Sequence, residues 1–300
     1  MDMTQNKCCR HGASLRRRRR RRRKILRSII FSCSIIAVAV FVAVGSRMIT
    51  SGDGRTNKYD VEAGNNTYDN AVIENSKISE NNKIQNEQSV LDDIMNSTQY
   101  PKQLQELALK NEEALEFVYD YPAEHVKEHT IDLTEEASMD SVPLFVQWDK
   151  RWGYEKYSGN FFAASGCGPT TLSMVVVYLT HNRDASPIAV AKYSKEAGYS
   201  VDGSGSSWTL ISEGSMHYGV KAKTVALDES RMKAELDEGH PIVVNVGPGD
   251  FTDTGHFMVI TGYDDEGFSI NDPNSIEKSG KRWLFKNISS QIRAVWSMYV

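Results

Sequence analysis

One cysteine stands where a thiol can react. Cys167 lies in the stretch SGCGPTTLSMVVVYLT, and the flanking residues Gly166, Gly168 and Pro169 predict a tight entry into an apolar helix. The first turn of a helix has backbone N–H groups without intrahelical partners, and these groups, together with the helix dipole, favour an anion. The position therefore favours the reactive thiolate. A small, buried and inert cysteine is an equally good interpretation of this feature taken alone.

A nucleophilic thiol needs a base, and one of the seven histidines lies in a suitable setting. His256 begins the strand-like stretch HFMVITGY, which is followed by a predicted turn at residues 264–266. Folding the chain about this turn brings His256 opposite residue 273, so that Asp272 falls within about one position of it. A carboxylate there would fix the tautomer of the imidazole and favour its charged form. A plain surface pair of His and Asp would show the same pattern.

The elements that would position these side chains follow from periodicity and capping residues. Helices come first and strands follow them, with helices expected at 101–122, 170–180, 186–198, 208–218 and 228–238 and strands at 241–246, 256–263, 267–272 and 294–300. This order predicts an α+β domain with an antiparallel sheet.

The start of the chain has a different character. Residues 1–27 carry twelve Lys or Arg against one Asp, although the whole chain has a net charge of -4. Residues 28–45 contain no charge, and a helix of this length is about 27 Å long, close to the thickness of a bilayer core. We expect a transmembrane helix, with the basic segment in the cytoplasm and the rest of the chain outside the cell. A signal peptide that is cleaved to release a secreted protein is the alternative.

The remaining chain divides by composition. Residues 46–98 are rich in Asn, Ser, Asp and Glu and poor in large apolar side chains, which predicts a disordered polar spacer. Residues 99–141 follow as an amphipathic helix and a connector, and residues 142–300 form the globular domain. Cys167 is the single cysteine of that domain, so no disulfide can form within it.

Some classes of function are disfavoured. The arginine run adjoins an uncharged segment and is better explained by membrane topology than by nucleic-acid binding. No phosphate-binding motif of an ATPase domain occurs in the chain. Asp202, Ser204 and Ser206 have the oxygen spacing of part of a calcium loop, but the acidic ligand that would close it is missing. We therefore expect neither a metal nor another cofactor.

Four stretches in combination resemble a known family. VPLFVQWDKRW, SGCGPTTLSMV, GHFMVITGYD and INDPNS are similar to motifs of the C39-like peptidases in the papain superfamily. The resemblance spans residues 142–300 and implies a papain-like cysteine protease fold that hydrolyses peptide bonds through Cys167, His256 and Asp272. It also implies that Gln147, about twenty residues before the nucleophile, contributes to the oxyanion hole.

The substrate is expected to be a peptide or a protein. Trp148, Ser207 and Trp208 lie close in sequence to these motifs or in a Gly/Ser-rich loop, and are candidates for substrate binding. Two other functions stay open: an amidase or transferase that acts on cell-wall peptide with the same triad, and a cell-surface binding module without catalysis. The reactivity of the Cys167 thiol toward an electrophile would separate a catalytic from a structural cysteine.

Overall fold

The computed structural model describes residues 85–300 of the 300-residue chain. The basic segment 1–27, the expected transmembrane helix 28–45 and most of the expected spacer lie outside the described residues. From residue 85 onward, no helix is long and apolar enough to cross a membrane.

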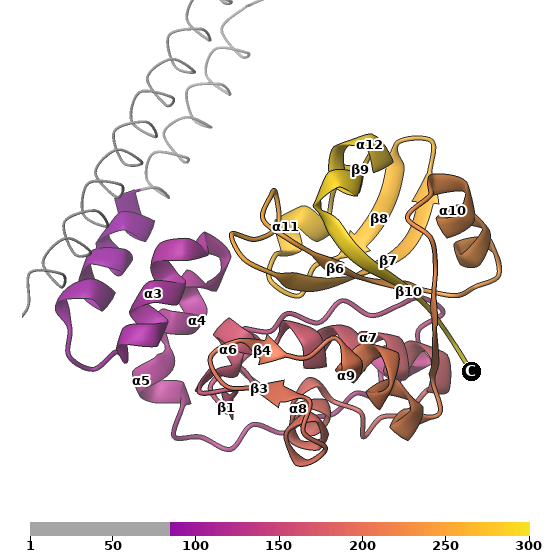
Figure 1. Ribbon diagram of the computed structural model, residues 1–300. Helices are drawn as coiled ribbons and strands as arrows, with labels where there is room; N and C mark the ends of the chain where they lie inside the picture. Colours follow the sequence, from indigo (N-terminus) through magenta and orange to yellow (C-terminus); the bar gives the residue numbers. More distant parts are fainter. Residues whose placement is uncertain (1–84) are drawn as a thin grey trace, which may run out of the picture. The chain divides into compact units, whose positions relative to one another are not determined.

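A six-stranded antiparallel sheet forms the centre of the domain, in the order β5-β10-β6-β7-β8-β9 (Figure 1). Its strands are β5 (Lys221–Thr224), β6 (Ile242–Val246), β7 (His256–Asp264), β8 (Gly267–Asn271), β9 (Arg282–Trp283) and β10 (Ile292–Tyr299). Two short hairpins lie apart from it, built from β1 (Lys156–Tyr157) with β2 (Asn160–Phe161) and from β3 (Ser200–Val201) with β4 (Gly205–Ser206).

Helices cover both faces of this sheet. The α-helices are α3 (Lys102–Lys110), α4 (Leu115–Tyr119), α5 (Tyr121–Glu124), α6 (Phe162–Ser165), α7 (Cys167–Thr180), α8 (Pro187–Glu196), α9 (Thr209–Ser212), α10 (Glu229–Asp237), α11 (Ile276–Ser279) and α12 (Phe285–Ile288). Short 3-10 helices are η1 (Glu112–Ala114), η2 (Glu136–Ser138), η3 (Gly214–Tyr218) and η4 (Ser289–Gln291). The expected combination of helices with an antiparallel sheet is confirmed.

Alternation along the strands explains how the sheet is covered on two sides. In β7, Phe257 and Val259 belong to the buried cluster that contains the apolar residues of α7, whereas Met258 and Ile260 belong to the cluster that contains Met232 of α10. Successive side chains of a strand point to opposite faces. An apolar run such as HFMVI therefore gives a strand buried on both sides.

Helix α7 is the most deeply buried helix of the domain's first half. Its ten positions from Gly168 to Val177 are all buried, and the helix ends at His181, which adopts a left-handed backbone conformation. An apolar run without a polar face is expected of a helix that is enclosed on all sides. The sequence predicted its start at Thr170, but the helix begins at Cys167.

Capping residues bound two of the predicted helices. Ser186 accepts a hydrogen bond from the backbone N–H of Ala189 at the start of α8. Asp228 accepts one from the N–H of Arg231 at the start of α10. Gly198 and Gly239 follow these helices with positive φ, a conformation that glycine adopts without strain.

The chain before the sheet differs from the sequence-based expectation. The single helix expected over 101–122 ends at Lys110, because Asn111 has an extended backbone and caps η1 with its side chain. Residues 85–96, which we assigned to the disordered spacer, are helical. The reason is Ile94, which is fully buried in a cluster with Leu104 and Val118.

Two further differences concern weak local signals. The helix expected over 208–218 is a short α9 followed by the 3-10 helix η3, and Gly219 ends it with positive φ. Strands β5 and β9 were not predicted. β5 has the sequence KAKT and is the outer strand on one side, where lysine side chains remain in solvent and protect an open edge.

Candidate active site

Cys167 is the first residue of α7, at the end of the helix that favours a negative charge. The residue keeps some exposure to solvent, although its surroundings are densely packed. Burial raises the pKa of the thiol, but the hydrogen bond and the charge of His256 lower it. The backbone N–H groups of Phe257 and Gly168 lower it further, and the net pKa lies below the ordinary value of a thiol. The site therefore favours the thiolate.

His256 begins β7 and is almost completely buried. Its Nε2 atom lies 2.7 Å from Oδ1 of Asp272, so Nε2–H donates to the carboxylate and Nδ1 is the nitrogen left for the thiol. Burial lowers the pKa of the imidazole, but the charge and hydrogen bond of Asp272 raise it, and Cys167 adds to this effect. The net pKa is raised above the ordinary value of a histidine, which favours an imidazolium.

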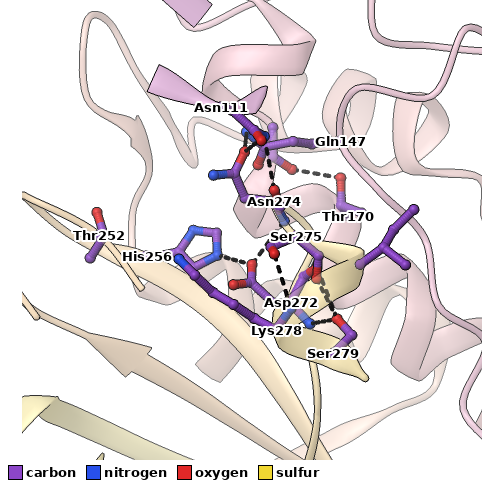
Figure 2. Close-up of polar contacts among 12 residues, drawn as sticks. Asn111, Gln147, Thr170, Thr252, His256, Asp272, Asn274, Ser275, Lys278 and Ser279 are labelled. Carbon is purple, nitrogen blue, oxygen red and sulfur yellow. Dashed lines mark hydrogen bonds and ion pairs between the residues drawn. The ribbon is translucent and has the colours of Figure 1, made fainter. Parts of the chain in front are cut away.

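Asp272 is fully buried and follows directly after β8. Strand β7 pairs with β8 in a register that sets Val259 opposite Asn271, with an irregularity between Ile260 and Gly262. This register brings Asp272 to His256 at the open end of the hairpin (Figure 2). Continued past Asn271, the register sets His256 opposite residue 274 rather than the expected 273, so Asp272 lies two positions from direct opposition. Residues two positions apart share a face, and the two side chains form a hydrogen bond across this diagonal.

The loop after Asp272 holds the carboxylate in place. The backbone N–H of Asn274 donates to Oδ1 of Asp272 over 2.8 Å, and the backbone N–H of Asp272 donates to Oγ of Ser279 over 2.9 Å. Oδ2 of Asp272 is buried and has no hydrogen-bond partner. The hydrogen bonds from His256 and from the backbone N–H of Asn274 are therefore both accepted by Oδ1 of the carboxylate.

Gln147 lies beside these residues, but its amide is oriented differently from what the resemblance implies. Nε2 donates to the carbonyl of Ala163 over 2.7 Å and to Oδ1 of Asn274 over 3.3 Å, and Oε1 is buried without a partner. Both N–H bonds of the amide are therefore used within the protein. To donate to an oxyanion, the amide must first release one of these partners.

The candidate substrate-binding residues are not gathered at one place. The indole N–H of Trp148 donates to the carbonyl of Asn274, and its ring packs against the helices before the sheet. Ser207 bonds locally to Thr209. Trp208 is 47% exposed, and its ring contacts that of Trp296 at a centroid distance of 6.0 Å.

Trp208 belongs to a row of aromatic rings that ends at Phe257. The ring of Trp296 also lies 6.4 Å from the ring of Phe257, whose backbone N–H interacts with the Cys167 thiol. The ring of Trp208 therefore packs on Trp296, which in turn packs on Phe257, the residue that follows His256. Trp148 lies instead at the Asp272 loop.

Sequence reasoning missed several polar residues of the site. Asn274 links Asp272 to Gln147, and Asn111 donates through Nδ2 to the carbonyl of Asn274 over 2.9 Å. Glu113 accepts hydrogen bonds from the same loop. The sequence NEE at 111–113 carries the signal of a helix N-cap, but this signal does not indicate a contact 163 residues away.

The arrangement has the parts needed for nucleophilic catalysis. A thiol with a lowered pKa at a helix start interacts with the imidazole of His256, and a buried carboxylate orients this imidazole. Such a set can attack a carbonyl carbon and pass a proton to the leaving group.

Comparison with known proteins agrees with this chemistry. The family model described as "Peptidase_C39 like family" matches residues 139–300, and the chain belongs to that family. Family membership indicates a peptidase of the cysteine type. No curated protein matches the chain.

Two solved structures are similar at low identity. One is the peptidase domain of Streptococcus ComA, a bifunctional ABC transporter involved in a quorum-sensing pathway, with 19% identity, coverage of 45% of this chain and 90% of that chain, and a TM-score of 0.37. The other is a candidate C39-like peptidase from Bacillus anthracis, with 17% identity, coverage of 53% and 95%, and a TM-score of 0.33. At these values the likenesses carry no argument about activity.

Proposed function

We propose that the protein is a cysteine peptidase in which Cys167 is the nucleophile, His256 the general acid and base, and Asp272 the orienting carboxylate. The observation that carries the proposal is the coupling of these groups: the thiol pKa is lowered by His256, and His256 donates to a fully buried Asp272. The family of the chain supports the same reaction class.

The proposed reaction follows from these positions. The thiolate of Cys167 attacks the carbonyl carbon of a peptide bond and forms a C–S bond, while the carbonyl oxygen becomes an oxyanion. The Nδ1–H of the His256 imidazolium gives its proton to the leaving nitrogen as the C–N bond breaks. Water then attacks the thioester, the neutral imidazole takes one of its protons, and the thiolate leaves. Asp272 keeps the imidazole in the required tautomer throughout.

The oxyanion needs donors. The backbone N–H of Cys167 lies in the first turn of α7, where it has no partner within the helix. In the proposed mechanism Gln147 is the second donor, and substrate binding releases one of its N–H bonds from Ala163 or Asn274. Each donor of this kind contributes about 2.7 to 4 kcal/mol to transition-state stabilisation in other hydrolases.

The proposal extends to the location of the enzyme. The uncharged segment 28–45 and the arginine-rich segment before it support a single membrane anchor, with the N-terminus in the cytoplasm and the peptidase domain outside the cell. The substrate is then an extracellular peptide or protein. A thiol reagent that does not cross membranes, applied to intact cells that express a variant with Cys167 as its single cysteine, is expected to label it. Labelling only after lysis would contradict the location.

Peptide cleavage tests the activity. The full-length protein is incubated with a peptide library, and the products are identified by mass spectrometry, with Cys167→Ala as the matched control. Cleavage by the wild-type protein alone supports the proposal. An unreactive thiol and no cleavage would instead indicate a binding module, and a reactive thiol without cleavage would favour the amidase or transferase.

A further inference from the structure

The loop that carries Asp272 is held by residues that lie before the family match. The match begins at residue 139, but Asn111 and Glu113 contact the loop of residues 272–279. We propose that Asn111 and Glu113 are positioning residues for Asp272, so that the helical segment 102–124 is part of the catalytic apparatus. The proposal deepens the cysteine peptidase function proposed above and rests on it.

Asn111 makes the first of the two connections. It ends α3 with an extended backbone, is buried, and accepts a hydrogen bond from the N–H of Glu113 through its Oδ1. Its Nδ2 donates to the carbonyl oxygen of Asn274 over 2.9 Å and to Oδ1 of Asn274 over 3.2 Å (Figure 2). The side chain thus fixes its own turn with the oxygen and the distant loop with the nitrogen.

Glu113 makes the second connection, to the start of α11. Its Oε2 accepts hydrogen bonds from the backbone N–H of Ile276 over 2.7 Å and of Glu277 over 3.1 Å, and its Oε1 accepts one from Oγ of Ser275. These N–H groups belong to the first turn of the helix and have no intrahelical partners. Glu113 therefore caps a helix that is 163 residues away in the chain.

The hydrogen bonds reach the reacting groups in a short sequence. Asn111 holds Asn274, and the backbone N–H of Asn274 donates to Oδ1 of Asp272. The same oxygen accepts the hydrogen bond from His256. A displacement of Asn274 would therefore shift Oδ1, the carboxylate oxygen that orients the imidazole. Oδ2 has no hydrogen bond that could keep the carboxylate in place instead.

The helical segment is itself anchored to the nucleophile's side of the site. Leu104, Leu115 and Val118 share a buried cluster with Phe161 and Ala163, which lie just before α7. The helical segment thus contacts both the residues just before Cys167 and the loop that carries Asp272. The helical segment therefore sets the distance between Cys167 and Asp272, which come from different parts of the chain.

Other residues also contact the loop, and they define what the helical segment adds. Within the family match, the backbone N–H of Gln147 donates to the carbonyl of Pro273, and the indole N–H of Trp148 donates weakly to the carbonyl of Asn274. Neither contacts the N–H groups at the start of α11. Within residues 85–300, Ser275 accepts from the N–H of Lys278, and Glu113, which lies before the match, accepts from those of Ile276 and Glu277.

Two isosteric variants of the full-length protein test the proposal. Asn111→Asp keeps the oxygen that accepts from residue 113 but removes the N–H donor to Asn274. Glu113→Gln keeps the shape but removes the charge from the cap of α11. Glu112→Gln is the matched control, because Glu112 is exposed and carries the same charge one position away.

We expect each positioning variant to lower kcat/KM about tenfold, mostly through kcat, whereas the control stays within about twofold. We also expect the pH dependence of Cys167 alkylation by iodoacetamide to change, because a misplaced carboxylate stabilises the imidazolium less. The thiol pKa would then rise, so that on lowering the pH the fast reaction of the thiolate is lost at a higher pH than in the wild type.

Alkylation needs no substrate, so it separates this proposal from the peptidase function. A wild type that cleaves no peptide, but whose variants shift the alkylation profile, would contradict the proposed function and support the positioning role. Variants that leave both kcat/KM and the alkylation profile unchanged overturn the inference. A loss of activity that follows only the loss of folded protein, with an unchanged pH profile in what remains folded, overturns it as well.

Discussion

The two ends of the candidate triad are positioned by different interactions. Cys167 begins a helix with ten consecutive buried positions, so apolar packing fixes the nucleophile. Asp272 lies in a loop that is held by hydrogen bonds: Asn274 donates to Asp272, Asp272 donates to Ser279, and Asn111 of the helical segment donates to Asn274. Packing energy is spread over many contacts, whereas a hydrogen-bonded loop depends on a few. Single polar substitutions should therefore disturb the position of Asp272 more than that of Cys167.

The largest effect is expected at the nucleophile itself. Cys167→Ala should reduce turnover to background, on the order of 10⁵-fold or more, because no other group in the site can form the acyl intermediate. The fold should survive, since the removed sulfur sits at the helix end rather than within the packed stretch. Peptide cleavage and circular dichroism measure the two effects. Full turnover by the variant would refute the role of Cys167.

The next effect tests the hydrogen-bonded end. Asp272→Asn should lower kcat about 10²-fold without eliminating it, because the imidazole loses its orienting charge. The raised pKa of His256 falls when that charge is removed, so the alkaline limb of the kcat/KM profile moves to lower pH. The lowered pKa of Cys167 rises as its imidazolium partner is lost, so the acid limb moves to higher pH. A profile of unchanged width would argue against the pairing.

A third substitution tests the packed end. A Cβ at Gly168 would lie 2.6 Å from Oγ and 2.8 Å from Cβ of Ser206, so Gly168→Ala must shift the start of α7 or the Ser206 strand. We expect a loss of about tenfold in kcat/KM, from misplacement of the adjacent thiol. The double variant Gly168→Ala with Ser206→Gly removes the clash and should recover most of the loss. Failure to recover would show that space at this contact is not what matters.

The smallest effect should appear behind the site. Ser186 caps α8, which packs on α7 but bears no catalytic group. Ser186→Ala should lower the free energy of unfolding by about 1 kcal/mol, with kcat/KM unchanged. Urea denaturation and peptide cleavage provide the two measurements. A clear drop in kcat/KM would mean that the packing of α8 on α7 affects the position of the Cys167 thiol, contrary to the expectation above.

Some of the site follows from sequence, and the reason is local. The pairing of His256 with Asp272 depends on one hairpin, whose turn and alternating pattern are written in adjacent residues. The start of α7 is likewise marked by glycines and a proline. The antiparallel sheet follows from four strands with strong apolar patterns.

The rest depends on contacts between distant segments. Asn111 has the local signal of a helix N-cap, but nothing near it indicates that its amide meets Asn274. The direction of the Gln147 amide depends on the carbonyl of Ala163, which no pattern in the VQWDKRW stretch predicts. The edge strand β5 lacks an apolar pattern because most of its side chains are exposed to solvent.

The burial of the Asp272 carboxylate against His256 has an evolutionary consequence. A buried carboxylate whose cationic partner is removed costs about 3 to 5 kcal/mol, whereas the thiol at the helix tip can disappear at little cost to the fold. A descendant that gave up catalysis would thus lose its cysteine first and keep the histidine and the aspartate as a structural pair. Inactive homologues should carry that signature, a conserved His–Asp pair facing a small inert residue.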